Sequence, residues 1–183
     1  NIEGVDGVTD DTTARVFSES PPVGTTEEDL RRLRFFGGEV DGPSRQIARY
    51  VDRIADQYLR NLDVLMIYRL DRFGRGGHHR PFNDAGFPAV RIMETHENYT
   101  RQHQDVRVED GIAYGDVIEG VDFDYAAKLT GLNVAVLASL AWGLAQDART
   151  LIVARVVQGL GAALMNPSTL SIITVAFPPR ERG

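Results

Sequence analysis

The feature that most constrains the fold of this 183-residue chain is a change of character near residues 141–147. Residues 1–125 carry 24 Asp and Glu against 15 Lys and Arg, a net charge of −9. Residues 126–183 carry 2 Asp and Glu against 5 Lys and Arg, a net charge of +3. Residues 156–176 contain no charge, and this length is enough for one helix to cross a bilayer core. We therefore expect two parts, residues 1–143 and residues 144–183.

The composition of the acidic part excludes some functions. Nucleic acid is not an expected partner, because phosphate binding needs a clustered Lys and Arg surface. The chain has no Cys, so any metal would be held by His and carboxylate side chains. The first residue is Asn, and no basic and apolar leader follows it, so we interpret the N-terminus as an internal starting point. Native localisation stays open.

The first sixty residues divide into a loop and a helix. Residues 1–43 are dense in Gly, Asp, Thr, Glu and Pro and show no apolar period, which predicts a loop. Residues 44–59 have helical spacing and predict an amphipathic surface helix, with Ser44 placed to cap it. Its apolar face is formed by Ile47, Val51, Ile54 and Tyr58.

Two apolar runs and a second helix complete the acidic part. Residues 63–70 predict a buried strand, and residues 89–93 predict a second strand after the turn Gly86-Phe87-Pro88. A helix is expected from Asp122 onward. Its predicted buried face is Tyr125, Ala126, Leu129, Leu132, Val136, Leu137 and Leu140. Strands that alternate with helices favour an α/β sandwich.

All four histidines lie within twenty-six residues and are interleaved with Glu94, Glu97 and Asp105. They are His78, His79, His96 and His103. Imidazole and carboxylate are the zinc ligands used when thiolates are absent, so one hypothesis is a metal site. The alternative is a set of merely polar loop histidines, since no compact ligand motif such as His-Glu-x-x-His is present. Adjacent histidines tend to point apart, so the first two are not expected to bind one ion.

A longer pattern carries a resemblance. Residues 77–91 read Gly-His-His-Arg-Pro-Phe-Asn-Asp-Ala-Gly-Phe-Pro-Ala-Val-Arg, and Glu97-Asn98-Tyr99 and His103 follow. This order resembles the C-terminal half of the zinc-dependent exopeptidases, which include leucyl aminopeptidases, glutamate carboxypeptidase and glutaminyl cyclase. The likeness covers about residues 1–140. It implies a three-layer α/β sandwich, present here as an incomplete mixed sheet with flanking helices, a zinc cofactor, and hydrolysis of a terminal residue from a peptide substrate.

The resemblance also implies roles for single residues. His103 corresponds to the last zinc ligand, and His79 to a histidine that shapes the site without binding metal. Two positions depart from the family pattern: His78 stands where the family has Asp, and Gln102 where an aromatic residue usually precedes the ligand. Tyr99 is the candidate to substitute for that aromatic group.

The resemblance implies that most of the site is missing. In the family the other ligands, a His, a bridging Asp, a Glu-Glu pair and another Asp, come before the position of residue 1. A catalytic zinc needs about three protein ligands and an open position for water. We therefore assign no catalytic residue and expect no peptidase activity from the chain alone.

The apolar tail carries a second resemblance. The pattern Leu151-x-x-x-Arg155-x-x-Gln158-Gly159-x-Gly161-Ala162-Ala163 is similar to a signature in the fourth membrane helix of major facilitator drug/proton antiporters. It implies membrane association through residues 150–177. Arg180 and Arg182 after the apolar run predict that the C-terminal end lies in the cytoplasm. The alternative is a buried helix of a water-soluble domain, interrupted at Asn166-Pro167. One helix cannot transport a substrate, because transporter sites lie between helices.

Three hypotheses follow for the chain as a whole. The first is a partial zinc exopeptidase domain joined to a transporter-like transmembrane helix. The second is a membrane transporter fragment behind an unrelated leader. The third is a chimera without a selected function, whose crossover would lie within residues 137–145, since that sequence fits the end of one segment and the start of the other.

Overall fold

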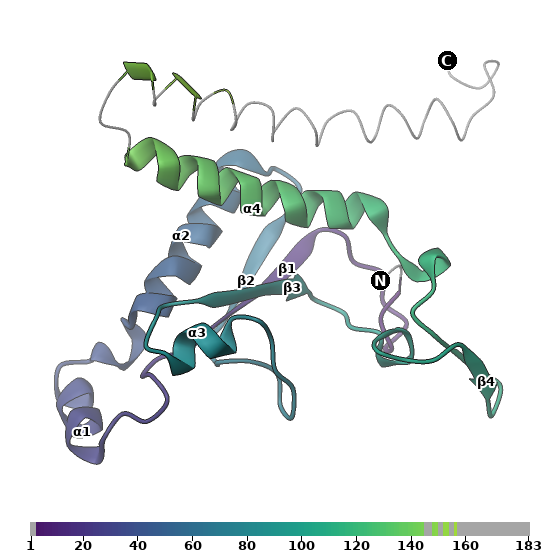
Figure 1. The fold of residues 1–183 in the computed structure, drawn as a ribbon, viewed down its shortest axis with the longest axis horizontal. Coiled ribbons are helices and arrows are strands. Elements are labelled where there is room, and N and C mark those ends of the chain that lie inside the picture. Colours follow the sequence, from purple (N-terminus) through teal and green to yellow (C-terminus); the bar gives the residue numbers. More distant parts are fainter. Residues whose placement is uncertain (1–2, 145–147, 150–151, 154–155, 157–183) are drawn as a thin grey trace. The chain divides into compact units, whose positions relative to one another are not determined.

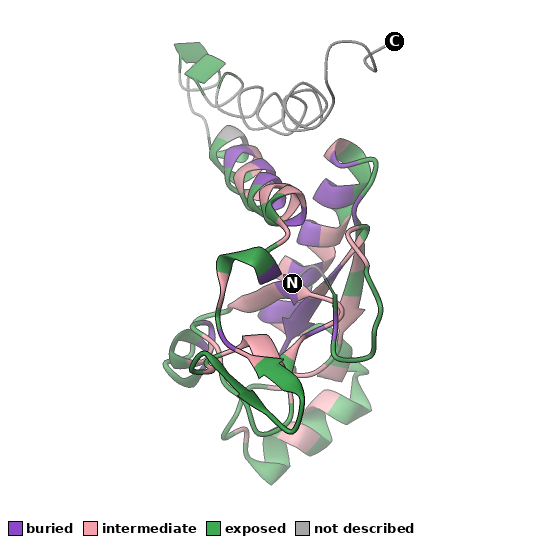
Figure 2. Cartoon of the chain, turned by 90° about the vertical axis from the view of Figure 1, so that its right-hand side faces the viewer, coloured by how far each residue is buried: buried purple, intermediate pink, exposed green. Residues whose placement is uncertain are grey.

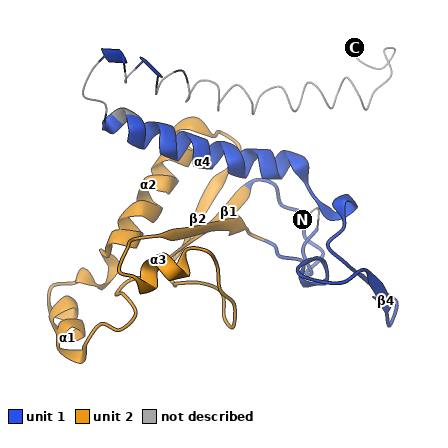
Figure 3. Ribbon diagram, viewed as in Figure 1, with its two compact units in different colours: residues 1–12, 96–183 blue, residues 13–95 orange. Residues whose placement is uncertain are grey.

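The structure is a computed structural model that describes residues 3–144, 148–149, 152–153 and 156. The chain divides into two compact units, coloured separately in Figure 3. One unit is Thr13–Thr95, and the other combines Asn1–Thr12 with His96–Gly183. The described part contains both helices and strands, which confirms the predicted mixture of α and β structure.

The unit of residues 13–95 is built on a mixed three-stranded sheet (Figure 1). Its strands are β1 (Thr13–Ser18), β2 (Asp63–Ile67) and β3 (Val90–Glu94), in the order β2-β1-β3. β1 pairs parallel with β2 and antiparallel with β3. The central strand is the most buried, because it is covered by a strand on each side and by helix α2 (Pro43–Tyr58), as the burial colours of Figure 2 show.

The prediction of a loop over residues 1–43 is wrong. That stretch holds β1, helix α1 (Glu27–Phe35) and the 3-10 turn η1 (Gly38–Val40). α1 has no buried residue, so no apolar period could reveal it. It is stabilised at its ends: the Thr26 hydroxyl accepts from the Asp29 N–H, acidic residues fill the first turn, and Arg32 and Arg34 lie in the last turn.

The amphipathic helix predicted over residues 44–59 is confirmed as α2. Its inner side buries small and branched residues, Ala48, Val51, Ile54 and Ala55. Ser44 does not cap it, because Pro43 opens the helix and Gly42 is the cap residue. The Ser44 hydroxyl is instead buried and accepts from the Ala89 N–H at 3.2 Å.

The two predicted strands are confirmed as β2 and β3, with one correction. β2 is not a buried strand: Asp63 and Leu65 are exposed, because β2 lies at an edge of the described sheet. Between β2 and β3 the chain forms a loop and the short helix α3 (Arg80–Asp84).

The other unit contains loops, a hairpin and one long helix. Its short elements are η2 (Tyr99–Arg101), β4 (Arg107–Glu109), β5 (Ile112–Tyr114) and η3 (Ile118–Gly120). β4 and β5 pair antiparallel through a two-residue turn, Asp110-Gly111. Both turn residues have positive φ, 51° and 79°, which is the geometry that an Asp-Gly hairpin favours.

The helix predicted from Asp122 is confirmed as α4 (Phe123–Gly143), but its buried face is only partly the predicted one. Tyr125 and Leu132 are buried as expected, and they are joined by Ala135 and Ala138. Three of the predicted core residues, Ala126, Leu137 and Leu140, are exposed, while Leu129 and Val136 are half-buried. The last turns of α4 are apolar all round, so the sequence pattern could not determine the helical phase.

Among the residues that the structure describes, no helix combines the length and the apolar character needed to cross a bilayer. The predicted span, residues 156–176, lies outside the described residues except for its first residue. That span and the division into residues 1–143 and 144–183 stay predictions.

Candidate functional site

His103 lies on an exposed loop with an unusual backbone. Its φ is +54°, in the left-handed region that few residues other than glycine occupy, Asn, Asp and His being the most frequent of these, at a cost of about 1–2 kcal/mol. The carboxylate of Asp116 holds this turn, since Oδ2 accepts from the His103 N–H at 3.0 Å and Oδ1 from the Gln104 N–H at 3.5 Å. The imidazole itself is exposed. A pinned turn therefore presents the predicted zinc ligand to solvent.

The base of the β4–β5 hairpin is tied to the same turn. The Gly115 N–H donates to the Thr100 carbonyl at 3.0 Å, and the Asp116 N–H donates to the Gln104 carbonyl at 3.3 Å. Gly115 has a φ of 138°, and a Cβ there would lie 2.9 Å from Cγ2 of Val106. A glycine is thus required where the hairpin closes.

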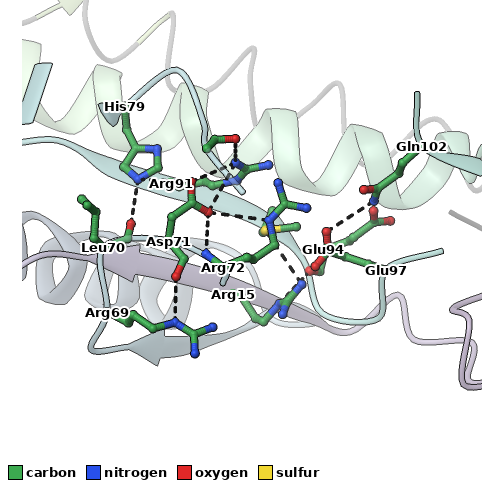
Figure 4. A network of polar contacts seen from close by, with 12 residues as sticks. Arg15, Arg69, Leu70, Asp71, Arg72, His79, Arg91, Glu94, Glu97 and Gln102 are labelled. Atoms are coloured by element: carbon green, nitrogen blue, oxygen red, sulfur yellow. Dashed lines mark hydrogen bonds and ion pairs between the residues drawn. The ribbon is translucent and has the colours of Figure 1, made fainter. Parts of the chain in front are cut away.

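Glu97 is a buried carboxylate on the segment that leads to His103. It is 6% exposed, and the Gln102 amide donates to Oε1 at 3.4 Å (Figure 4). The Tyr99 hydroxyl donates to Oε2 at 3.4 Å. Tyr99, the predicted aromatic substitute, therefore has its hydroxyl directed to Glu97. The sequence placed Glu97 among the carboxylates near the histidines, but nothing in the local pattern indicates that it is buried.

The segment of residues 3–12 binds this loop through its backbone. The Val5 N–H donates to the Glu97 carbonyl at 2.9 Å, and the Asn98 amide donates to the Glu3 carbonyl at 3.0 Å. The Asn98 side chain also caps η2, because its Oδ1 accepts from the Thr100 N–H at 3.1 Å.

His96 is engaged by carboxylates of the same segment. Its Nδ1 lies 2.6 Å from Oδ2 of Asp6, and since a carboxylate only accepts, Nδ1 carries the proton. Its Nε2 lies 3.9 Å from Oδ2 of Asp10. The hydrogen bond from His96, together with one from the Val8 N–H, lowers the pKa of Asp6. His96 is therefore a hydrogen-bond partner here.

His79 belongs to the other unit and is buried in a polar network around Asp71 (Figure 4). Its Nε2 donates to the Leu70 carbonyl at 2.7 Å and lies 3.9 Å from Oδ2 of Asp71. Nη1 of Arg91 lies 3.3 Å from the same oxygen, and the Arg72 N–H donates to Oδ1 at 2.7 Å. His79 thus holds the loop of residues 69–79 together, while its neighbour His78 is exposed.

The described residues do not fit a complete zinc site. No group of three or more His, Asp or Glu side chains in this part of the chain is arranged to hold a metal ion. Catalytic zinc takes about three protein ligands and a water. The exposed imidazole of His103 is suited to supply one ligand.

Comparison with known proteins identifies relatives over most of the chain. A probable zinc metalloprotease of Pyrenophora teres f. teres is 46% identical over 143 residues, 76% of this chain and 29% of that protein. One of Leptosphaeria maculans is 46% identical over 134 residues, 73% of this chain and 31% of that protein. One of Phaeosphaeria nodorum is 37% identical over 145 residues, 79% and 28% respectively.

This chain is similar to part of a zinc metalloprotease. It spans about three tenths of the length of these relatives. No protein-family model matches the chain, and no solved structure matches it. The similarities support a zinc metallopeptidase-like domain, and a match over three quarters of the chain necessarily includes its central residues, among them His79, Tyr99 and His103.

Proposed function

We propose that this chain is the C-terminal part of a zinc exopeptidase-type domain in which His103 supplies one zinc ligand. The observation that carries the proposal is the exposed imidazole of His103 on a left-handed turn, within the region shared with the zinc metalloproteases. The other ligands and the general base would come from sequence preceding Asn1.

Backbone strain supports a functional role for His103. In the left-handed conformation a residue that has a Cβ is strained, whereas glycine is not. Such backbone strain is concentrated at functional sites. The structure holds this turn with a dedicated carboxylate, Asp116. This turn keeps the imidazole exposed, as ligation requires.

The reaction of the complete domain would be hydrolysis of a terminal residue from a peptide. Zinc would polarise the carbonyl and activate water, and a carboxylate base would have to lie within hydrogen-bond reach of that water. No group of three or more His, Asp or Glu side chains among the described residues could hold a metal ion, and we expect no peptidase activity from the chain alone.

A zinc titration followed by NMR tests the proposal. We expect weak zinc binding that perturbs the His103 imidazole and that His103→Ala removes. His78→Ala is the matched control, because His78 is also an exposed loop histidine. Tight stoichiometric binding, or binding unchanged in His103→Ala, would show that the ligand assignment is wrong.

Sequencing the gene upstream of Asn1 gives an independent test. The proposal requires a His, a bridging Asp, an adjacent Glu-Glu pair and a further Asp within the preceding coding sequence. Their absence would overturn the exopeptidase assignment, whatever the zinc titration shows.

A further inference from the structure

We propose that the β4–β5 hairpin, with Val106 beside it, is a docking surface for an extended, positively charged peptide with apolar side chains. The inference rests on the proposed function, since the peptide would be the substrate of the completed domain. Three observations carry it: open strand edges, exposed valines and local negative charge.

The hairpin offers backbone edges. β4 and β5 form a two-stranded sheet, so within the described chain each strand has its outer edge unpaired. Extended peptides bind such edges by adding a strand, with main-chain hydrogen bonds supplying affinity and side-chain contacts supplying specificity. The Asp110-Gly111 turn sets the register of the two strands, and the Gly115 and Asp116 N–H groups bond the base of the hairpin to Thr100 and Gln104.

One face of the hairpin is apolar and exposed. Val108 lies opposite Ala113, so both project from the same face. Val106 directly precedes β4. Val106 and Val108 are each 75% exposed. The opposite face is closed by Arg107, whose guanidinium lies 4.0 Å from the ring centre of Tyr114. The apolar side chains of a bound peptide would therefore meet the valine face.

The charge of this region selects the peptide. Residues 103–119 contain five carboxylates and one arginine, a net charge of −4 with His neutral. Arg107 is itself paired, since its Nε lies 3.0 Å from Oε2 of Glu109. A cationic peptide is attracted by such a field, whereas an acidic peptide is repelled.

The hairpin lies within reach of the candidate zinc ligand. Val106 is three residues from His103, so the two Cα atoms are separated by at most about 11 Å. The bonds from Thr100 and Asp116 fix the base of the hairpin to the turn of His103. A peptide docked along this surface would therefore have one of its own peptide bonds close to His103, the candidate zinc ligand.

The test is an NMR titration of the whole chain in metal-free buffer with acetyl-Lys-Leu-Val-Leu-Lys-amide. We expect shifts in the backbone amides of residues 106–114. The double variant Val106→Thr/Val108→Thr keeps the β-branched shape but adds hydroxyls, and it should weaken binding about tenfold. Acetyl-Glu-Leu-Val-Leu-Glu-amide should bind the wild-type chain at least about tenfold more weakly.

Control variants separate this inference from the zinc assignment. Val23→Thr alters a 64% exposed valine of the other unit and should leave affinity unchanged. His103→Ala should also bind the peptide normally, so a failed zinc titration does not imply failed docking. Equal affinity of the double variant, equal affinity for the acidic peptide, or shifts confined to other residues would overturn the proposal. So would hairpin shifts that depend on protein concentration alone, because these would identify a second copy as the occupant.

Discussion

Two histidine-bearing loops of this chain, residues 69–79 and residues 96–104, follow a sheet strand in the same way and yet differ in kind. In the first, His79 is buried and donates to a backbone carbonyl. In the second, His103 is exposed on a turn whose backbone is strained. The comparison shows that residue type and spacing do not separate a structural histidine from a candidate ligand. Burial, hydrogen bonding and φ do.

The two loops also use a carboxylate differently. The Asp71 side chain is 4% exposed and is surrounded by Arg91, Arg72 and His79, so its charge is compensated inside the protein. The Asp116 carboxylate is exposed and accepts from two backbone N–H groups. The first arrangement stabilises a loop internally, while the second shapes a turn that stays accessible.

Removal of Asp71 should lower the unfolding free energy more than any other change considered. It is the sharpest test of the buried network in the loop of residues 69–79. Asp71→Ala removes the buried carboxylate that pairs with Arg91 and Arg72, and breaking a buried ion pair typically costs about 3–5 kcal/mol. Urea unfolding followed by circular dichroism measures the loss. Asp84→Ala, an exposed carboxylate of the same stretch, should change the unfolding free energy by less than about 0.5 kcal/mol. Similar losses in the two variants would contradict the difference drawn between the loops.

Glycine at position 103 should raise the unfolding free energy, by less than Asp71→Ala lowers it. Glycine adopts φ of +54° without strain, so His103→Gly should raise the unfolding free energy by about 0.5–1 kcal/mol relative to His103→Ala. Both variants remove the imidazole, so the difference between them reports the backbone alone. Asp110→Gly is a positive control, because Asp110 has a φ of 51°. If glycine stabilises position 110 but not 103, the turn of His103 is not strained.

Sequence patterns predicted the elements that have a clear apolar face or run. α2 shows helical spacing, and β2 and β3 are compact apolar segments. β1 escaped detection because the polar residues Thr13, Arg15 and Ser18 interrupt its apolar side chains, although it becomes the central strand. The central position of β1 is set by its pairing with β2 and β3, which lie far along the chain. It therefore cannot be predicted from the local sequence.

The candidate site was predictable only in part for the same reason. The resemblance pointed to His103, and the metalloprotease relatives support the zinc context. Asp116, thirteen residues away, was missed because its role is a contact closed by the hairpin turn. His79 was placed near the site by resemblance, and the structure adds that it is a buried member of the Asp71 network.

The smallest expected effect concerns the contact between His96 and Asp6, which connects the segment of residues 3–12 to the loop of residues 96–104. The His96 hydrogen bond is the main cause of the lowered pKa of Asp6, so His96→Ala should raise that pKa toward its ordinary value of 3.8. Carboxyl NMR signals followed through an acid titration measure it. Asp10→Asn is the matched control, because Asp10 lies 3.9 Å from the other ring nitrogen and should change the pKa of Asp6 less.

The sign of the pH dependence follows from the same shift. A carboxyl whose pKa is lower in the folded state stabilises that state above its unfolded pKa, and this contribution is lost as the pH falls through the folded value. For Asp6 the loss should therefore begin below about pH 4. The protection factor of the Val5 amide, which bonds to Glu97, is obtained from hydrogen exchange after correction for the intrinsic rate at each pH. It should fall in acid in the wild-type chain but vary less with pH in His96→Ala. If both proteins respond alike, the contact between His96 and Asp6 does not stabilise the segment of residues 3–12. That segment is then held to the loop of residues 96–104 by backbone hydrogen bonds alone.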